Sequence, residues 1–191
     1  MAFSIAIIGA GPRGTYCLRR LSLYLENHPF HDSVTIHVIE KSGKFGGGAA
    51  HSTDLPGYLL LNTIGSQITA FGDDDAEARS AEERKTLWGY LVNKGVHIEP
   101  DGYPSRAQHG QYLADMFRWT LEHLPEKVTV DCHHAELLDI KPGNGERLEL
   151  LLSNDQTLTV DETLLSTGHA VGAINSGSQA GQWNQFAEEQ Q

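Results

Sequence analysis

The stretch "SIAIIGAGPRGTYCLRRL", residues 4–21, decides the fold of this chain. Its β-branched start predicts a strand buried on both faces, and its later leucines predict a helix. Between them lies Gly9-Ala10-Gly11-Pro12-Arg13-Gly14, which fits the pattern G-x-G-x-x-G. In a dinucleotide-binding turn, the first glycine permits a tight turn and the second lets backbone approach the pyrophosphate, while the third lets the helix pack on the strand. Pro12 suits the first turn of a helix, where its missing N–H is not needed.

The segment after this turn supplies the context that the motif needs. "VTIHVIE", residues 34–40, is rich in β-branched residues and predicts a second strand, so that strand, turn, helix and strand form a right-handed βαβ unit. Glu40 ends that strand, where a carboxylate accepts hydrogen bonds from ribose hydroxyls and repels a 2′-phosphate. The sequence therefore predicts a site for the adenosine of FAD or NAD, and not of NADP.

The rest of the chain divides into a loop, two helical segments and a β-rich part. Residues 41–71 are glycine-rich and irregular, which is typical of a binding loop. Helices are expected within residues 73–95 and over residues 110–124. Four short strands are expected, with a hairpin turn at Gly143-Asn144-Gly145. They cover "KVTVDCHH" (127–134), "AELLDIK" (135–141), "ERLELLLS" (146–153) and "QTLTVDETLLSTG" (156–168).

Composition limits the class of protein. The chain has 191 residues, 39% of them hydrophobic and 20% charged, as expected for one globular domain. Its net charge of −11 argues against nucleic acid or an anionic membrane as a partner. Cys17 and Cys132 are too few for a disulfide framework, and the apolar run 5–8 is too short to span a bilayer. These features predict a soluble, cytoplasmic protein.

Four motifs together resemble the two-dinucleotide-binding-domain flavoprotein superfamily. They are GAGPRG, a glycine-rich loop leading to P-x-x-L-L-L-N, "YPSRAQHGQYL" (103–113), and a strand ending in T-G-H. More narrowly, the chain is similar to a bacterial family of FAD-NAD(P)-binding proteins with relatives among flavin N-hydroxylases. The resemblance covers about residues 1–169. It implies an α/β fold: a Rossmann-like FAD-binding domain over residues 1–170 with a central parallel sheet, a β-meander and a helical insertion at about 73–124. Residues 171–191 are polar, without apolar periodicity, and predict a flexible tail.

The resemblance implies FAD bound in an extended form across the sheet, with NAD(P)H as electron donor. The residues implied to contact FAD lie in four separate segments of the chain. They are Gly9, Gly11, Pro12, Arg13 and Gly14 at the pyrophosphate; Glu40 and Lys41 at the adenosine ribose; Gly46, Gly47, Gly48, Leu61, Asn62 and Thr63 at the ribityl chain or the flavin; and Thr167 and Gly168 at the flavin's phosphates.

A flavin carries out the redox chemistry itself, so no catalytic triad is expected. His51, just after the glycine loop, is a candidate for moving protons near neutral pH, with a surface or structural role as the alternative. Arg106 could meet a flavin phosphate or an acidic substrate, or only bridge a surface turn. His133 and His134 are neighbours on a strand and point to opposite faces, and neither cysteine has a C-x-x-C partner, so no metal site is predicted.

The length of the chain bears on its function. Full enzymes of this superfamily carry a second βαβ unit for NAD(P)H, and no second G-x-G-x-x-G follows a strand here. We expect an FAD-binding domain of a flavin-dependent, NAD(P)H-linked, monooxygenase-like oxidoreductase acting on an unidentified small molecule. The chain is then the N-terminal part of a larger or split protein, or is served by a partner chain that supplies the NAD(P)H half. The alternatives are an NAD-binding dehydrogenase or sensor domain, and a non-catalytic truncated binding module.

Overall fold

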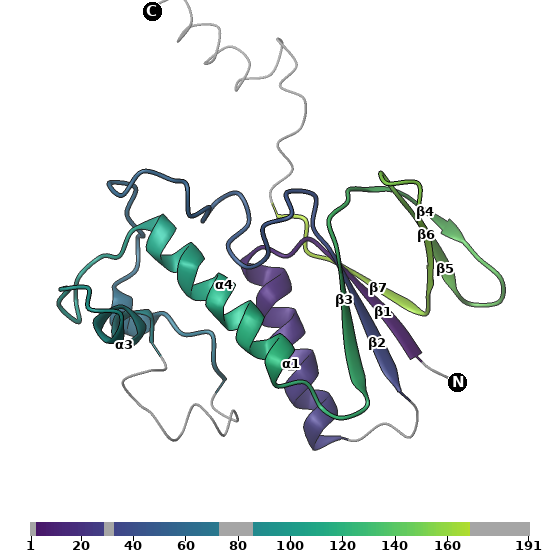
Figure 1. Cartoon of the computed structure of the whole chain (residues 1–191), viewed down its shortest axis with the longest axis horizontal. Helices are drawn as coiled ribbons and strands as arrows, with labels where there is room; N and C mark the ends of the chain where they lie inside the picture. The colour runs from purple at the N-terminus through teal and green to yellow at the C-terminus, as the bar shows by residue number, and fades with distance from the viewer. Residues whose placement is uncertain (1–2, 29–32, 73–85, 169–191) are drawn as a thin grey trace, which may run out of the picture.

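The computed structural model describes residues 3–28, 33–72 and 86–168 (Figure 1). Its central sheet has four parallel strands in the order β3-β2-β1-β7. They are β1 (Phe3–Ile8), β2 (Val34–Ile39), β3 (Val128–His133) and β7 (Glu162–Leu165). Buried β-branched residues such as Ile36, Val38 and Ile39 suit strands that are covered on both faces.

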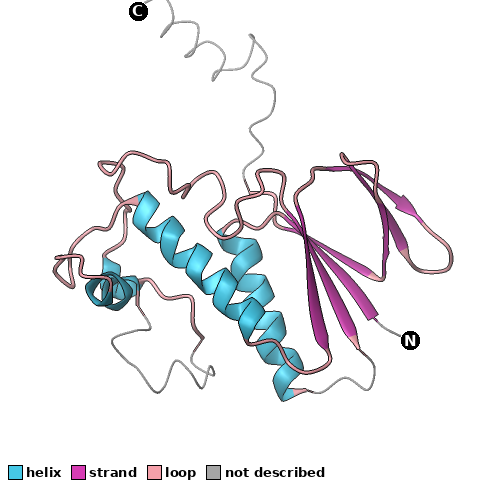
Figure 2. Cartoon of the chain, in the orientation of Figure 1, coloured by secondary structure: helices cyan, strands magenta, loops and turns pink. Residues whose placement is uncertain are grey.

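Two long helices cover one face of this sheet, α1 (Pro12–Asn27) and α4 (Arg106–Glu122) (Figure 2). Ile7, Ile36 and Val38 of the sheet meet Leu18 of α1 and Phe117 of α4 in one buried cluster. The helical spacing of the apolar residues gives each helix one face directed to the sheet.

A three-stranded antiparallel sheet covers the other face. It consists of β4 (Leu137–Pro142), β5 (Leu148–Leu152) and β6 (Thr157–Val160). Leu150, Leu152 and Val160 pack there against Ala6, Ile8 and Ile39 of the central sheet. The expected α/β class with a central parallel sheet and a meander is therefore confirmed.

A third cluster joins α4 to the segment around the short helices η1 (Gly65–Gln67) and α3 (Leu87–Asn93). Tyr112 of α4 is almost fully buried there, and its hydroxyl accepts a hydrogen bond of 2.7 Å from the Ala70 N–H. Residues 73–85 of the predicted insertion and the predicted tail 171–191 lie outside the described residues. None of the helices in the part of the chain that the structure describes combines the length and apolar character needed to cross a membrane.

Two predicted boundaries were wrong for local reasons. Helix α4 begins at Arg106 instead of residue 110, because Ser105 and Gln108 form a capping box that starts the helix earlier. Residues 156–168 form two strands in different sheets and not one. Asp161 separates them: its carboxylate accepts hydrogen bonds of 2.7 and 2.8 Å from the Ser4 N–H and hydroxyl, which fixes the crossing from β6 of the meander to β7 beside β1.

Candidate functional site

The predicted pyrophosphate turn lies between β1 and α1, at the carboxyl end of the parallel sheet. Gly9 has a φ of +94°, and a Cβ there would lie 2.6 Å from the carbonyl oxygen of Ser166. A Cβ at Gly14 would overlap the carbonyl oxygen of Gly9. The fold itself therefore requires glycine at both positions, for the turn and for close packing of helix on strand.

Gly11 differs, because the surrounding chain does not require a glycine there. Its backbone is extended, with φ −70° and ψ −168°, a conformation open to any residue. A Cβ at Gly11 would lie 3.6 Å from the Cα of Gly48, which is ordinary contact. The missing side chain leaves the backbone of Gly11 open to close approach by a ligand.

The N-terminus of α1 is open to an anion. No side chain caps it, its first turn holds no acidic residue, and Pro12 occupies its start. Helices α3 and α4, by contrast, are capped by the hydroxyls of Thr86 and Ser105. The first-turn N–H groups of α1 and the partial positive charge of the helix thus remain available to phosphate. Arg13 extends to solvent beside them.

Glu40 stabilises the turn through hydrogen bonds of its carboxylate. Its side chain is buried, and one carboxylate oxygen accepts a hydrogen bond of 2.9 Å from the Ala10 N–H. The other accepts from the N–H and hydroxyl of Ser42 at 3.0 and 2.7 Å. The predicted role at a ribose would use Oε2, which accepts only the Ala10 N–H and can accept one further hydrogen bond. Lys41 is exposed, and its Nζ lies 3.8 Å from a carboxylate oxygen of Glu136.

The glycine loop predicted at residues 46–48 is brought to the turn. The Gly46 N–H donates to the Ala10 carbonyl at 2.7 Å, and the Thr15 hydroxyl donates to the Gly46 carbonyl at 3.3 Å. Gly47 packs against the backbone of His51, and Gly48 packs against Gly11. Two glycine segments far apart in the sequence therefore form one backbone surface between α1 and α4.

Of the two remaining segments predicted to contact FAD, one lies at the glycine turn and the other lies away from it. The Ser166 N–H donates to the Ile8 carbonyl at 2.7 Å, so Thr167 and Gly168 follow directly beside Gly9. Asn62 and Thr63 are exposed, and their neighbours bond elsewhere: the Leu61 N–H donates to the Pro104 carbonyl at 2.9 Å. The structure therefore brings Thr167 and Gly168 to the turn, and holds Asn62 and Thr63 along the segment that leads into α4.

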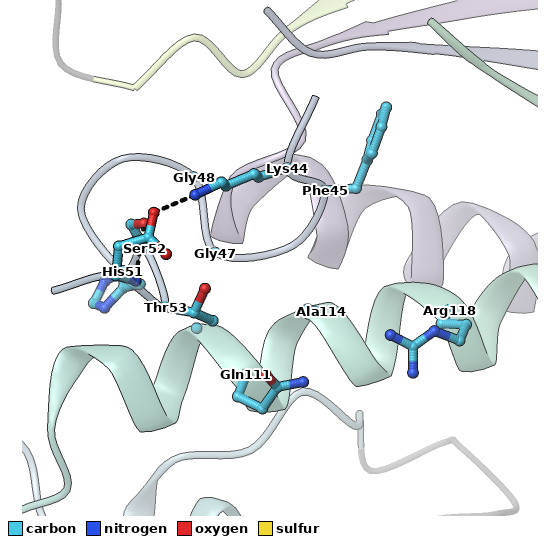
Figure 3. Close-up of a pocket in the computed structure, with 12 residues that line it drawn as sticks. Lys44, Phe45, Gly47, Gly48, His51, Ser52, Thr53, Gln111, Ala114 and Arg118 are labelled. Carbon is cyan, nitrogen blue, oxygen red and sulfur yellow. Dashed lines mark hydrogen bonds and ion pairs between the residues drawn. The ribbon is translucent and has the colours of Figure 1, made fainter. Parts of the chain in front are cut away.

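A hollow of about 350 Å³ lies between residues 44–54 and α4 (Figure 3). This volume falls in the range of small-molecule pockets. Lys44 and Asp54 form an ion pair at its edge, which lowers the pKa of the Asp54 carboxyl. His51 lines the same hollow from the glycine loop.

His51 is paired with His109 of α4, a residue that the sequence analysis did not single out. Their Nδ1 atoms lie 3.3 Å apart, so the N–H of one ring donates a hydrogen bond to the nitrogen of the other. Burial, and then the neighbouring His51, lowers the pKa of His109 to about 4. Burial and the charge of Arg106 also lower the pKa of His51. Both rings are therefore neutral at pH 7, and His51 can donate or accept one proton at the hollow.

Arg106 is the first residue of α4 and lines a second hollow formed by residues 49–60. Within residues 3–28, 33–72 and 86–168, no cluster of His, Cys, Asp or Glu side chains has the arrangement of a metal site. Cys17 and Cys132 are free thiols.

A model of the family described as FAD-NAD(P)-binding matches residues 6–170. The chain is 32% identical over 168 residues to nitrosuccinic acid synthase of Aspergillus oryzae, and 31% identical over 191 residues to an L-aspartate N-monooxygenase (nitrosuccinate-forming) of Streptomyces cremeus. These alignments cover 86% and 87% of this chain but only 26% and 28% of the two proteins. The chain thus spans little more than a quarter of the length of these curated relatives.

Solved flavoenzymes share the fold. A closed structure of cyclohexanone monooxygenase matches 91% of this chain and 28% of its own, with a TM-score of 0.58 and 17% identity. A flavin-containing monooxygenase from Stenotrophomonas maltophilia matches 87% of this chain and 38% of its own, with a TM-score of 0.54 and 17% identity. Together with the family match, these findings confirm the predicted fold and the predicted cofactors, FAD with NAD(P)H as electron donor.

Proposed function

Because this chain belongs to the FAD-NAD(P)-binding family, we propose that it is the FAD-holding part of an NAD(P)H-linked flavin monooxygenase. One observation supports this proposal most directly. Gly11 sits in an extended backbone with room for a Cβ, beside the uncapped start of α1. A ligand with a pyrophosphate explains both features, because it needs the space above Gly11 and the free N–H groups of the helix.

The residues present fit FAD. Gly11, Pro12 and Arg13 at the start of α1 would hold the pyrophosphate, and Gly9 and Gly14 shape the turn beneath it. Glu40 and Lys41 would face the adenosine ribose, and Glu40 also keeps the turn in shape through the Ala10 N–H. The backbone surface of Gly46, Gly47 and Gly48, with Thr167 and Gly168 beside Gly9, would line the remaining length of the cofactor. For Asn62 and Thr63 we propose a contact at the flavin end, near the start of α4.

Bound FAD would supply the redox chemistry, as acceptor of a hydride from NAD(P)H and donor of electrons to dioxygen. The residues of this chain bind and orient the cofactor and control protons around it. His51 is neutral at pH 7 and opens onto the hollow between the glycine loop and α4, so it can hold or release one proton there. A purely structural role of His51 in the pair with His109 is the alternative, and substitution distinguishes the two.

The relatives support a substrate class. Two proteins about one third identical to this chain are named for forming nitrosuccinate, one of them from L-aspartate. We therefore propose a small amino acid with a carboxylate side chain as substrate, oxygenated at its amino nitrogen.

The NAD(P)H half is proposed to come from another polypeptide segment, in the same longer protein or in a partner chain. Leu164 and Leu165 of β7, 40% and 63% exposed at the edge of the central sheet, support such a contact. The two free thiols support a cytoplasmic location, where cysteines stay reduced.

Calorimetric titration of the purified chain with FAD, NAD⁺ and NADP⁺ tests the assignment. We expect one FAD per chain, weaker binding of NAD⁺ and the weakest binding of NADP⁺, because the Glu40 carboxylate repels a 2′-phosphate. Binding of NAD⁺ in preference to FAD would instead identify a dehydrogenase or sensor domain. Binding of none of the three would identify a non-catalytic module.

A further inference from the structure

The second hollow is lined by a cation that has no ion-pair partner among residues 3–28, 33–72 and 86–168. This hollow has a volume of about 370 Å³ and is formed by the segment after the glycine loop and the start of α4. Of the described residues that line it, Arg106 alone is charged. The other lining residues are apolar or aromatic: Ala49, Ala50, Leu55, Tyr58, Leu59 and Leu60.

The backbone around Arg106 is well fixed. Its N–H donates to the Leu59 carbonyl at 2.7 Å, and the Leu61 N–H donates to the Pro104 carbonyl at 2.9 Å. Leu60 forms an antiparallel bridge with Ser105, whose side chain caps α4. The hollow and its arginine are therefore held by the same set of backbone hydrogen bonds, which favours a preformed site.

Other cations near this region are paired with acids. Lys44 pairs with Asp54, and Arg118, on the same helix as Arg106, lies 3.2 Å from Asp115. No carboxylate of the described residues forms an ion pair or hydrogen bond with the Arg106 guanidinium. An arginine left without an acid partner is available to an anion from outside, although the chain as a whole carries a net charge of −11.

Arg106 also acts on a neighbouring histidine. Burial, and then the positive charge of Arg106, lowers the pKa of His51, whose ring contacts His109. The walls of the hollow are open to solvent, with Tyr58 80% and Leu60 49% exposed, so a ligand can reach the guanidinium directly. The guanidinium also has the planar fork of donors that matches a carboxylate.

We propose that Arg106 binds a carboxylate of the substrate, with the apolar walls of the hollow against the carbon chain. The proposal rests on the proposed function, since it names the group that recognises the substrate. A cofactor phosphate is the other possible anion, but the lining of this hollow includes no residue of the glycine turn or of Gly46 to Gly48. The lining of the Arg106 hollow thus shares no residue with the pyrophosphate position at the start of α1.

The test uses succinate as a probe, with uncharged succinamide as its isostere, on the chain with and without FAD. Ring resonances of His51 in NMR report binding, because a carboxylate at Arg106 offsets the positive charge and raises the pKa of His51. We expect succinate but not succinamide to raise it. Arg106→Gln should weaken succinate binding by about tenfold or more, the loss of one charge-assisted contact. Arg118→Gln removes the same charge from the same helix and should leave the affinity within about twofold.

The other possible results overturn either the carboxylate site or the proposed function. Unchanged succinate affinity in Arg106→Gln, or no succinate binding by the FAD-loaded wild type, overturns the proposal and leaves the FAD assignment intact. Loss of FAD in Arg106→Gln overturns it too, and assigns Arg106 to the cofactor. A wild-type chain that binds succinate through Arg106 but never binds FAD supports the carboxylate site and refutes the proposed function.

Discussion

Substitution of Gly11 by alanine should change the affinity for FAD but not the stability of the fold. The new Cβ would lie 3.6 Å from the Cα of Gly48, without overlap, and the backbone angles suit alanine. Alanine lowers the conformational entropy of the unfolded chain, which raises the free energy of unfolding by about 0.4–1 kcal/mol. Alanine is also a poorer N-cap residue than glycine, which lowers the free energy of unfolding by about the same amount. The two effects offset each other, so we expect a melting temperature within about 3 °C of the wild type.

The affinity for FAD should change much more. The added methyl group occupies the space through which a phosphate approaches the backbone, so at least one hydrogen bond to a charged group is lost or lengthened. Such a bond is worth about 1.5–3 kcal/mol, which corresponds to a dissociation constant raised about 10- to 100-fold. Flavin fluorescence titration and thermal unfolding of the same samples measure the two quantities side by side.

Two other glycines serve as controls. A Cβ at Gly57 would meet no atom within 4 Å, so Gly57→Ala should change neither FAD affinity nor stability. Gly14→Ala would place its Cβ against the Gly9 carbonyl and should unfold the domain. If Gly11→Ala kept the wild-type affinity for FAD, or unfolded like Gly14→Ala, the assignment of Gly11 to the cofactor would be wrong.

Three further predictions concern residues that stabilise the structure around the site. Glu40→Ala leaves the buried Ala10 N–H without an acceptor and should destabilise the chain by about 1–3 kcal/mol, and an unchanged urea midpoint would contradict the stabilising role. The pKa of His109 is lowered to about 4 in the folded state, so its contribution to stability is complete above about pH 6.5 and is lost as the pH falls towards 4. Thermal unfolding from pH 7.5 to 4.5 should show this loss, and His109→Phe should reduce the slope; equal slopes would refute the argument. Asp161→Ala removes two acceptor contacts to Ser4 and should lower stability by about 1–2 kcal/mol in chemical denaturation, whereas the exposed Asp139→Ala should have little effect.

The glycine turn could be predicted from sequence because each of its requirements is local. Gly9 needs a positive φ and Gly14 needs close contact with its own turn, and both follow from spacing within six residues. The acid at the end of β2 was predicted for the same reason. Its hydrogen bonds to Ala10 and Ser42 were not, since they depend on how a loop folds back over the strand end.

The contact between the glycine loop and α4 needed the three-dimensional structure. His51 and His109 are 58 positions apart, and no periodic pattern links them. One signal was present: Gly110 lies inside a helix, where glycine costs about 1 kcal/mol relative to alanine. That cost is explained by the His51 carbonyl, which occupies the space where a Cβ of Gly110 would be. A helical glycine next to a histidine could therefore have indicated a loop packed against α4.

The split of residues 156–168 also had a sequence signal. Asp161 is a charged residue inside an otherwise strand-like run, and its carboxylate turned out to anchor the end of one sheet to the start of another. The direction of that crossing depends on Ser4, at the far end of the sequence, and could not be read from the segment itself.

The visible absorption spectrum of the purified chain, after incubation with FAD and removal of free cofactor, tests the central claim most directly. We expect flavin absorption bands that elute with the protein at about one FAD per chain in the wild type and in Gly57→Ala. In Gly11→Ala these bands should be strongly reduced. A folded wild-type chain that retains no flavin under these conditions would contradict the assignment of this turn to FAD.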